Sequence, residues 1–158
     1  MAYKSTGGST GLPDFFSDLV RCETRLYNAL NDSLRERHAI VTSQFECLRH
    51  LRDHPGSRVA DLAAAFAVGI GATSKSVDRL EKHGWVARQP NPSDRRSSLL
   101  ALTDDGRELV DAAEDTFTER LAELLADILD DPSMPAVART LATLRSALER
   151  AQTGMPTG

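Results

Sequence analysis

Apolar residues recur at three- and four-residue spacing along most of this chain, which is the pattern of amphipathic helices. From Leu12 this pattern predicts a first long helix that ends near Glu36. Ser43 and Glu46 form a plausible capping box for a second helix, which the His-Pro-Gly sequence at 54–56 ends. The inward face of the second helix consists of Phe45, Leu48 and Leu51.

The following segment predicts two shorter helices joined by a tight turn. Ser57 is placed to cap the first of them, and the second runs from about Ile70 to His83, with Gly84 as its C-terminal cap. The inward positions are Val59, Leu62, Ala63 and Phe66 in the first helix and Thr73, Val77 and Leu80 in the second. This arrangement is a helix-turn-helix.

The period then changes from that of a helix to that of strands. Residues 85–89 and 98–102 have strand character, and the turn Pro-Asn-Pro-Ser-Asp-Arg-Arg lies between them. Because the strands are short and the turn is charged, we expect a projecting wing rather than part of a larger sheet.

Two more helices are predicted after the wing. Thr103, followed by two aspartates, is an N-cap for a helix that we expect to continue as one stripe to about Ile128. The stripe is formed by Leu109, Ala113, Phe117, Leu121, Leu124 and Ile128. Residues 130–133 break it, and a final helix follows with Val137, Leu141, Leu144 and Leu148 on one face.

The terminal helices carry more apolar surface than one small winged module can cover, which predicts a second copy as partner. A two-fold dimer also places two recognition helices about one DNA turn apart, ~34 Å, as a palindromic site requires. The residues that we expect in the dimer core are Phe16, Tyr27, Leu30, Leu141, Leu144 and Leu148.

The predicted fold is mainly α: a winged helix-turn-helix with a two-stranded β wing, and N- and C-terminal helices that form a dimerisation region. The expected division is a disordered tail at 1–11, a dimerisation region at 12–36 and 104–150, a DNA-binding domain at 40–103 and a flexible tail at 151–158.

Charge is distributed unevenly along the chain. The net charge of −4 argues at first against nucleic acid, yet residues 58–102 carry seven Lys or Arg against four acids. From Thr103 onward the chain has twelve acidic residues and five arginines. The basic charge is therefore concentrated where the wing and the helix-turn-helix lie, which is the distribution that DNA binding needs.

Composition excludes several other classes. The sequence has no apolar run near the ~20 residues of a membrane span and no apolar stretch at its N-terminus, so we expect a soluble, cytoplasmic protein. No P-loop, Rossmann, GxSxG or HExxH pattern occurs, and the four His have no paired nucleophile, so we do not expect an enzyme. Cys22 and Cys47 have no metal-knuckle spacing and are first interpreted as small apolar residues.

The ordered set of motifs resembles the MarR family of bacterial transcriptional regulators. VADLAAAFAV is similar to the family's first helix of the helix-turn-helix, and SKSVDRLEKHGWVARQPNPSDRRSSLLALTDDG to its recognition helix, wing and following helix. The chain departs from the pattern at Ala67, where the family usually has Gly, and at the Gly-Ile-Gly-Ala-Thr that begins the recognition helix. Alanine is tolerated at the turn if its φ is not positive.

Several residues are candidates for contact with DNA. Ser74 and Lys75 are placed for the major groove, with Ile70 against a thymine methyl group; the alternative is a solvated helix face. Arg79 belongs to the same face, although Asp78 or Glu81 could hold it in a local ion pair.

In the wing, the resemblance implies that Asp94 orients Arg96 into the minor groove, and the alternative is a turn kept polar for solubility. Arg95 and Arg88 are expected to meet phosphates. Ser43, between Thr42 and Gln44, either binds a phosphate or only caps its helix.

The resemblance also implies regulation by a small aromatic ligand, an oxidant or zinc, with no cofactor required. Candidate effector-binding residues are Arg21, Cys22, Arg25, His38 and Cys47, and candidate zinc ligands are Cys22, Glu23, Glu36 and His38. For each of them a surface or core role is the alternative. Oxidant sensing is disfavoured because the family's reactive cysteine falls near Ser17.

These observations favour a homodimeric, sequence-specific binder of double-stranded DNA that acts as a repressor of a palindromic operator and responds to a small molecule or metal. The alternative is a winged-helix module that binds a protein partner without specific DNA binding. The basic segment at 58–102 argues for DNA.

Overall fold

The computed structural model describes residues 11–157, and this range holds seven helices and one two-stranded sheet. The elements are α1 (Leu12–His38), α2 (Thr42–Asp53), α3 (Val59–Phe66), α4 (Ile70–Lys82), β1 (Val86–Pro90), β2 (Ser98–Leu102), α5 (Asp104–Leu124), α6 (Ala126–Leu129) and α7 (Met134–Arg150). The predicted mainly helical fold with a two-stranded wing is therefore confirmed. Nearly all of the tail predicted at 1–11 lies outside the described residues.

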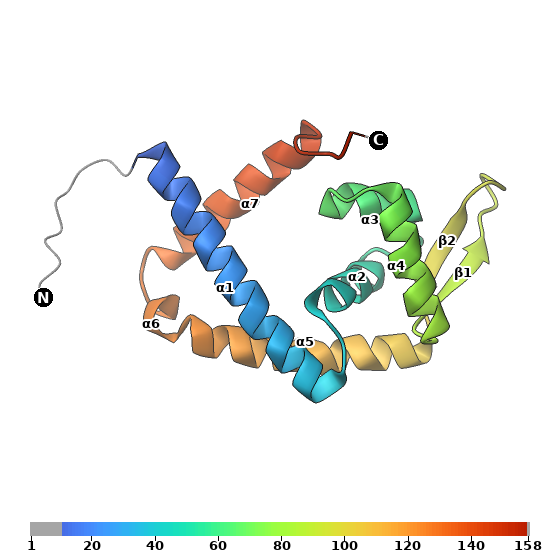
Figure 1. Ribbon diagram of the computed structural model, residues 1–158, viewed down its shortest axis with the longest axis horizontal. Coiled ribbons are helices and arrows are strands. Elements are labelled where there is room, and N and C mark those ends of the chain that lie inside the picture. The colour runs from blue at the N-terminus through green and yellow to red at the C-terminus, as the bar shows by residue number, and fades with distance from the viewer. Residues whose placement is uncertain (1–10, 158) are drawn as a thin grey trace, which may run out of the picture.

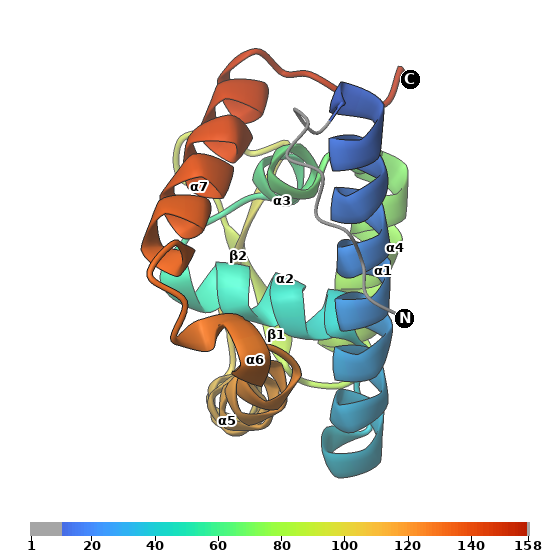
Figure 2. The ribbon, with the colours of Figure 1, turned by 90° about the vertical axis from the view of Figure 1, so that its left-hand side faces the viewer.

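Figure 1 shows how the elements are arranged around α5. α1 crosses α5 and packs against it, and α2 packs on α5 and on β2. α3 and α4 pack on each other, and the β1–β2 hairpin projects beside α4 (Figure 1). In Figure 2 α1 and α7 stand on opposite sides of the molecule. Within residues 11–157, none of the helices combines the length and apolar character that crossing a bilayer would require.

The core lies between α2, the helix-turn-helix and the first half of α5. The inward positions predicted for α2 and α4 are all buried, and Phe45 stacks on Phe117 of α5 at 4.7 Å between ring centroids. The largest side chains that are fully buried are Phe45, Leu34, Ile40, Leu48, Leu51, Leu62, Leu80, Leu100, Val77, Val86 and Val110. One continuous core therefore holds the helix-turn-helix and the base of the wing together.

Two of the predicted helix caps are wrong: the N-cap of α2 lies two residues before Ser43, and that of α3 lies one residue after Ser57. α2 begins at Thr42, where the Gln44 side chain accepts a hydrogen bond from the Val41 N–H at 3.0 Å, so Ser43 lies inside the helix. α3 is capped by Asp61, whose carboxylate accepts from the Arg58 N–H at 2.8 Å, while Ser57 donates to the His54 carbonyl instead. An acceptor three residues inside each helix meets the free N–H, which displaces the serine caps.

Two of the other caps agree with the sequence. The hydroxyl of Thr103 accepts from the Gly106 N–H at 3.0 Å, and Gly84 ends α4 with a φ of 78°. Ala67, however, also adopts a positive φ, of 50°, where a left-handed conformation is costly for any residue with a Cβ. The condition under which alanine would be tolerated without strain is not met.

The long helix after the wing is shorter than predicted. α5 ends at Leu124, Leu125 leaves the helical region with φ −99° and ψ 5°, and the four residues of α6 follow. No Pro or Gly stands at this break, so the apolar spacing alone predicts one continuous helix. α7 then runs back toward α3 (Figure 1).

Candidate nucleic-acid interface

Helix α4 separates a buried face from an open one. Thr73, Val77 and Leu80 are buried, and the Thr73 hydroxyl donates to the Gly69 carbonyl at 3.0 Å. On the other side Lys75 and Arg79 are exposed, Ser74 is half-buried and Ile70 is 62% exposed. The open face therefore presents two cations and one apolar side chain.

The wing is a regular antiparallel hairpin with a tightly bonded turn. Val86 pairs with Leu102 and Pro90 with Ser98 at its two ends. In the turn, Asp94 accepts a hydrogen bond from the backbone N–H of Arg96 at 2.9 Å, and Asn91 accepts from the Ser93 N–H at 3.0 Å. Asp94 thus shapes the main chain at Arg96, whereas the family resemblance implied that it orients the guanidinium.

The two arginines at the wing tip are available for a partner. Arg95 and Arg96 are both exposed, and neither is in an ion pair among residues 11–157. A guanidinium presents donors in a planar fork and remains charged at any physiological pH. The tip therefore offers two free, strongly basic groups at the end of a projecting hairpin.

Arg88, for which the sequence predicts a phosphate contact, is paired with two carboxylates in the structure. Its guanidinium donates to Asp78 at 2.7 Å and to Glu81 at 2.5 Å, both in α4. Partial burial opposes the charge, but hydrogen bonds with the two carboxylates outweigh it and raise the pKa of Arg88. Since Asp78 and Glu81 hold Arg88, the alternative that they hold Arg79 is wrong.

Ser43 lies at the start of α2, next to α4. It lines a narrow cleft of about 120 Å³ together with Gln44, Ser76 and Arg79. Its neighbour Thr42 is buried, so of the two hydroxyl groups only that of Ser43 is exposed. The structure brings Ser43 to the same side as Arg79, a proximity that the sequence does not reveal.

Comparison with known proteins is consistent with this geometry. The model of the MarR family matches residues 41–98, the segment from the start of α2 to the start of β2. An HTH-type transcriptional regulator of Bacillus subtilis, YfiV, is 30% identical over 109 residues, which are 69% of this chain and 68% of that protein. The chain belongs to the MarR family.

Other members are similar over longer stretches. The multiple antibiotic resistance protein MarR of Salmonella typhimurium is 29% identical over 72% of this chain and 87% of its own length. Among solved structures, a MarR mutant from E. coli complexed with operator DNA has a TM-score of 0.71 at 27% identity, covering 87% of this chain and 94% of its own. The repressor CouR bound to a 23-mer duplex has a TM-score of 0.74 at 26% identity, covering 91% and 99%. MarR-family proteins are transcriptional regulators and not enzymes, as the sequence predicts.

The terminal helices of this MarR-family chain carry exposed apolar side chains. Of the predicted dimer residues, Tyr27, Leu141, Leu144 and Leu148 are exposed and Phe16 is 66% exposed. Leu30 is only 4% exposed within the single chain, so it packs in the protomer and is not left for a partner. Four apolar residues that were not among the predicted dimer residues are exposed as well: Leu12, Phe15, Val20 and Val137.

The residues predicted to bind an effector do not converge. Arg21, Cys22 and Arg25 are exposed on α1, and Cys47 is buried in α2, where burial raises the pKa of its thiol to about 11. His38 is bonded through Nε2 to the Thr116 hydroxyl at 2.7 Å. A protonated, buried thiol is inert, so Cys47 belongs to the core.

The proposed zinc ligands are also too far apart. Cys22 and Glu23 lie near the middle of α1, and Glu36 and His38 at its end, so a helical rise of 1.5 Å per residue separates the pairs by about 20 Å. Among residues 11–157 no group of three His, Cys, Asp or Glu could hold a metal ion. The expectation of an intrachain zinc site on α1 is therefore wrong.

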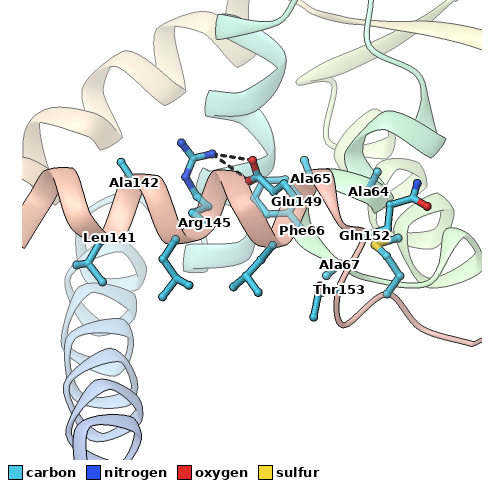
Figure 3. A pocket seen from close by; sticks show the side chains of 13 residues that line it. Ala64, Ala65, Phe66, Ala67, Leu141, Ala142, Arg145, Glu149, Gln152 and Thr153 are labelled. Carbon is cyan, nitrogen blue, oxygen red and sulfur yellow. Dashed lines mark hydrogen bonds and ion pairs between the residues drawn. The ribbon is translucent and has the colours of Figure 1, made fainter. Parts of the chain in front are cut away.

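A hollow of about 730 Å³ lies elsewhere, between α3 and α7 (Figure 3). Its apolar walls include Phe66, Leu141, Leu144 and Leu148, and Arg145 is paired with Glu149 at its side. None of the predicted effector residues lines it. This hollow could not be predicted from the sequence, because residues about 80 positions apart form its two walls.

Proposed function

We propose that this protein is a homodimeric repressor that binds a palindromic operator in double-stranded DNA and is regulated by a small molecule. The observation that supports DNA binding most strongly is the position of Arg95 and Arg96 at the tip of a hairpin beside the open face of α4, where neither forms an ion pair with the described residues 11–157. The family resemblance and the relatives solved with DNA support the same function.

In the proposed complex α4 enters the major groove and the wing follows the adjacent minor groove. Lys75 and Ser74 meet base edges, Ile70 meets a thymine methyl group, and Arg79 with Ser43 approaches the phosphate backbone. Arg96 enters the minor groove, where narrow A·T tracts attract a guanidinium, and Arg95 meets a phosphate.

The dimer is proposed from the terminal helices. No residue within α7 is buried, although its face carries four large apolar side chains. The N-terminal half of α1 has the same character, with Leu12, Phe15, Phe16 and Val20 exposed. A second copy that covers both helices removes this surface from water and supplies the second recognition helix that a palindrome needs. Residues 12–36 and 104–150 are therefore proposed as the dimerisation region and 40–103 as the DNA-binding domain.

The α3 side of the hollow, along Ala65 and Phe66, adjoins the α7 face that a second copy is proposed to cover, and it is proposed as the site of a small aromatic effector. Its apolar walls suit an aromatic ring, and α3, which forms one wall, packs on α4. Filling it with Ala65→Trp should abolish the rise in melting temperature that active aromatic compounds give. Ala60→Trp, on the exposed surface of the same helix and outside the hollow, is the matched control.

The experiment that tests DNA binding is titration of the purified protein against DNA upstream of its own gene and against a scrambled duplex, over a series of salt concentrations. A steep salt dependence with a large preference for the natural duplex is expected. Arg96→Ala should weaken binding by about 1–3 kcal/mol.

Arg37→Ala is the control for charge, because it removes one cation on the α1–α5 side of the molecule, where Arg37 pairs with Glu119. Equal, weak binding of both duplexes would contradict the proposal and favour a protein-binding module.

A further inference from the structure

Arg88 connects the wing to the recognition helix. It lies on β1, and its guanidinium bridges to two carboxylates of α4, Asp78 at 2.7 Å and Glu81 at 2.5 Å. Its side chain is 27% exposed, less than either of its partners. A single side chain thus joins the two elements that are proposed to read different grooves.

The position of Arg88 along the hairpin makes this bridge the outermost anchor of the wing. At the base, Val86 and Leu100 are buried in the core, and the Leu100 N–H donates to the Ser57 carbonyl at 2.8 Å. Beyond Arg88, no residue from Gln89 to Ser97 is buried. Without the bridge, the outer hairpin keeps its own strand pairing, its base and the electrostatic attraction between Asp94 and Arg58 at the start of α3.

The bridge also changes the charge that α4 presents. Asp78 follows Ser74 by about one helical turn and Glu81 follows it by about two, and two free carboxylates there would repel phosphate. The guanidinium compensates part of that charge and is held in a fixed fork. The two carboxylates already accept the hydrogen bonds that the guanidinium would otherwise donate to a phosphate.

We propose that Arg88 is a positioning residue, which fixes the wing relative to α4 so that Arg96 and Lys75 meet their grooves in register. This inference rests on the proposed DNA binding and assigns to Arg88 a role in specificity. It has no direct contact with DNA.

The sign of one substitution distinguishes this role from a phosphate contact. Asp78→Asn/Glu81→Gln makes the protein more positive by two charges and frees Arg88. If Arg88 binds phosphate, this variant binds DNA more tightly. If Arg88 positions the wing, the variant loses preference for its site in spite of the added positive charge.

The experiment uses a duplex selected by the wild-type protein from a randomised pool, with a scrambled duplex of the same composition as reference. The variants are Arg88→Gln, Arg88→Lys, Asp78→Asn/Glu81→Gln and the triple change, with Arg37→Gln as charge control. Thermal unfolding checks that each variant is folded. Because exposed ion pairs contribute little to stability, the melting temperatures should stay close to that of the wild type.

We expect Arg88→Gln and the double carboxylate change each to lower the ratio of selected to scrambled affinity about tenfold, and the triple variant to lose no more than either. Arg88→Lys should keep only part of the wild-type ratio of selected to scrambled affinity, because an ammonium group lacks the planar fork of a guanidinium. An unchanged or higher ratio of selected to scrambled affinity in the double carboxylate variant would overturn the inference. So would a triple variant in which Arg88→Gln lowers that ratio further by the same factor as it does alone.

Hydrogen exchange measured without DNA tests whether Arg88 holds the wing in place, independently of whether the protein binds DNA specifically. The peptide that spans β1 and β2 should exchange faster in Arg88→Gln and in the double carboxylate variant than in the wild type. Unchanged exchange in both would overturn the inference even if DNA binding is specific. If the wild type does not discriminate between duplexes, the proposed function fails, and the role of Arg88 in specificity fails with it.

Discussion

The helix-turn-helix half of the molecule and its terminal helices use apolar residues in opposite ways. From Ile40 to Ala113 the large apolar side chains other than Phe66, Val68 and Ile70 converge on one core, and its largest members are fully buried. In α7 and the first half of α1, similar side chains at similar spacing remain exposed. The same helical pattern therefore gives a self-sufficient domain in one region and an unfinished one in the other, which a second copy is proposed to complete.

The largest effect on stability is expected from a substitution in the core of the helix-turn-helix half. Phe45→Ala removes a fully buried ring that stacks on Phe117, and should cost about 3–5 kcal/mol in free energy of unfolding. Chemical denaturation measures it. The loss should be the same at every protein concentration once assembly is accounted for, and a loss below 1 kcal/mol would contradict the assignment of this ring to the core.

A change in the exposed apolar face of α7 should alter the oligomeric state of the protein. Leu144 is 40% exposed in the single chain, and Leu144→Asp places a charge on the stripe proposed to face a partner. A charge buried without a partner costs several kcal/mol, so the dimer should dissociate at micromolar concentration while the monomer keeps its helical content. Analytical ultracentrifugation measures this outcome. Thr143→Asp, exposed and off the stripe, should remain dimeric; dissociation of both variants would show that the stripe has no special role.

A pair of glycines sharpens the comparison within the self-sufficient half. At Gly106 a Cβ would collide with the backbone carbonyl of Trp85, where β1 and α5 meet, so Gly106→Ala should cost about 1–3 kcal/mol. At Gly71, in α4, a Cβ meets nothing within 4 Å, and Gly71→Ala should stabilise the protein by up to about 1 kcal/mol. Denaturation midpoints of the two variants should move in opposite directions. A stable Gly106→Ala protein would mean that the wing base is loosely packed.

The smallest expected effect concerns the turn of the helix-turn-helix. Ala67 adopts a φ of 50°, which costs about 1–2 kcal/mol for a residue with a Cβ, whereas glycine adds entropy to the unfolded chain. Ala67→Gly should therefore raise the free energy of unfolding by about 0.5–1 kcal/mol. Ala65→Gly, inside α3, should lower it by a similar amount, and a lower stability of both variants would contradict the strain at Ala67.

Much of the fold follows from local rules that the sequence displays. The start of α1, the Thr103 cap, Gly84 at the end of α4 and the inward faces of α2 and α4 all agree with their patterns, because a helix buries the residues that share one of its faces. The predictions that are wrong depend on competition or distance. Gln44 and Asp61 form the capping hydrogen bonds in place of the predicted serines. The helix break at Leu125 has no Pro or Gly that would indicate it in the sequence.

For the candidate site, residue order and composition are enough to tell which residues are basic and which elements carry them. The helix-turn-helix, the wing and the concentration of positive charge at 58–102 are properties of order and composition. Which of these charges are free of ion pairs depends on how the elements pack against one another. Arg88 and Arg96 belong to the same hairpin, but the packing of β1 against α4 places two carboxylates beside Arg88, while the projecting turn leaves Arg96 exposed. Likewise the structure buried Leu30 and left Leu144 open, because burial depends on what packs against a helix face, and the spacing that defines the face does not encode its neighbour.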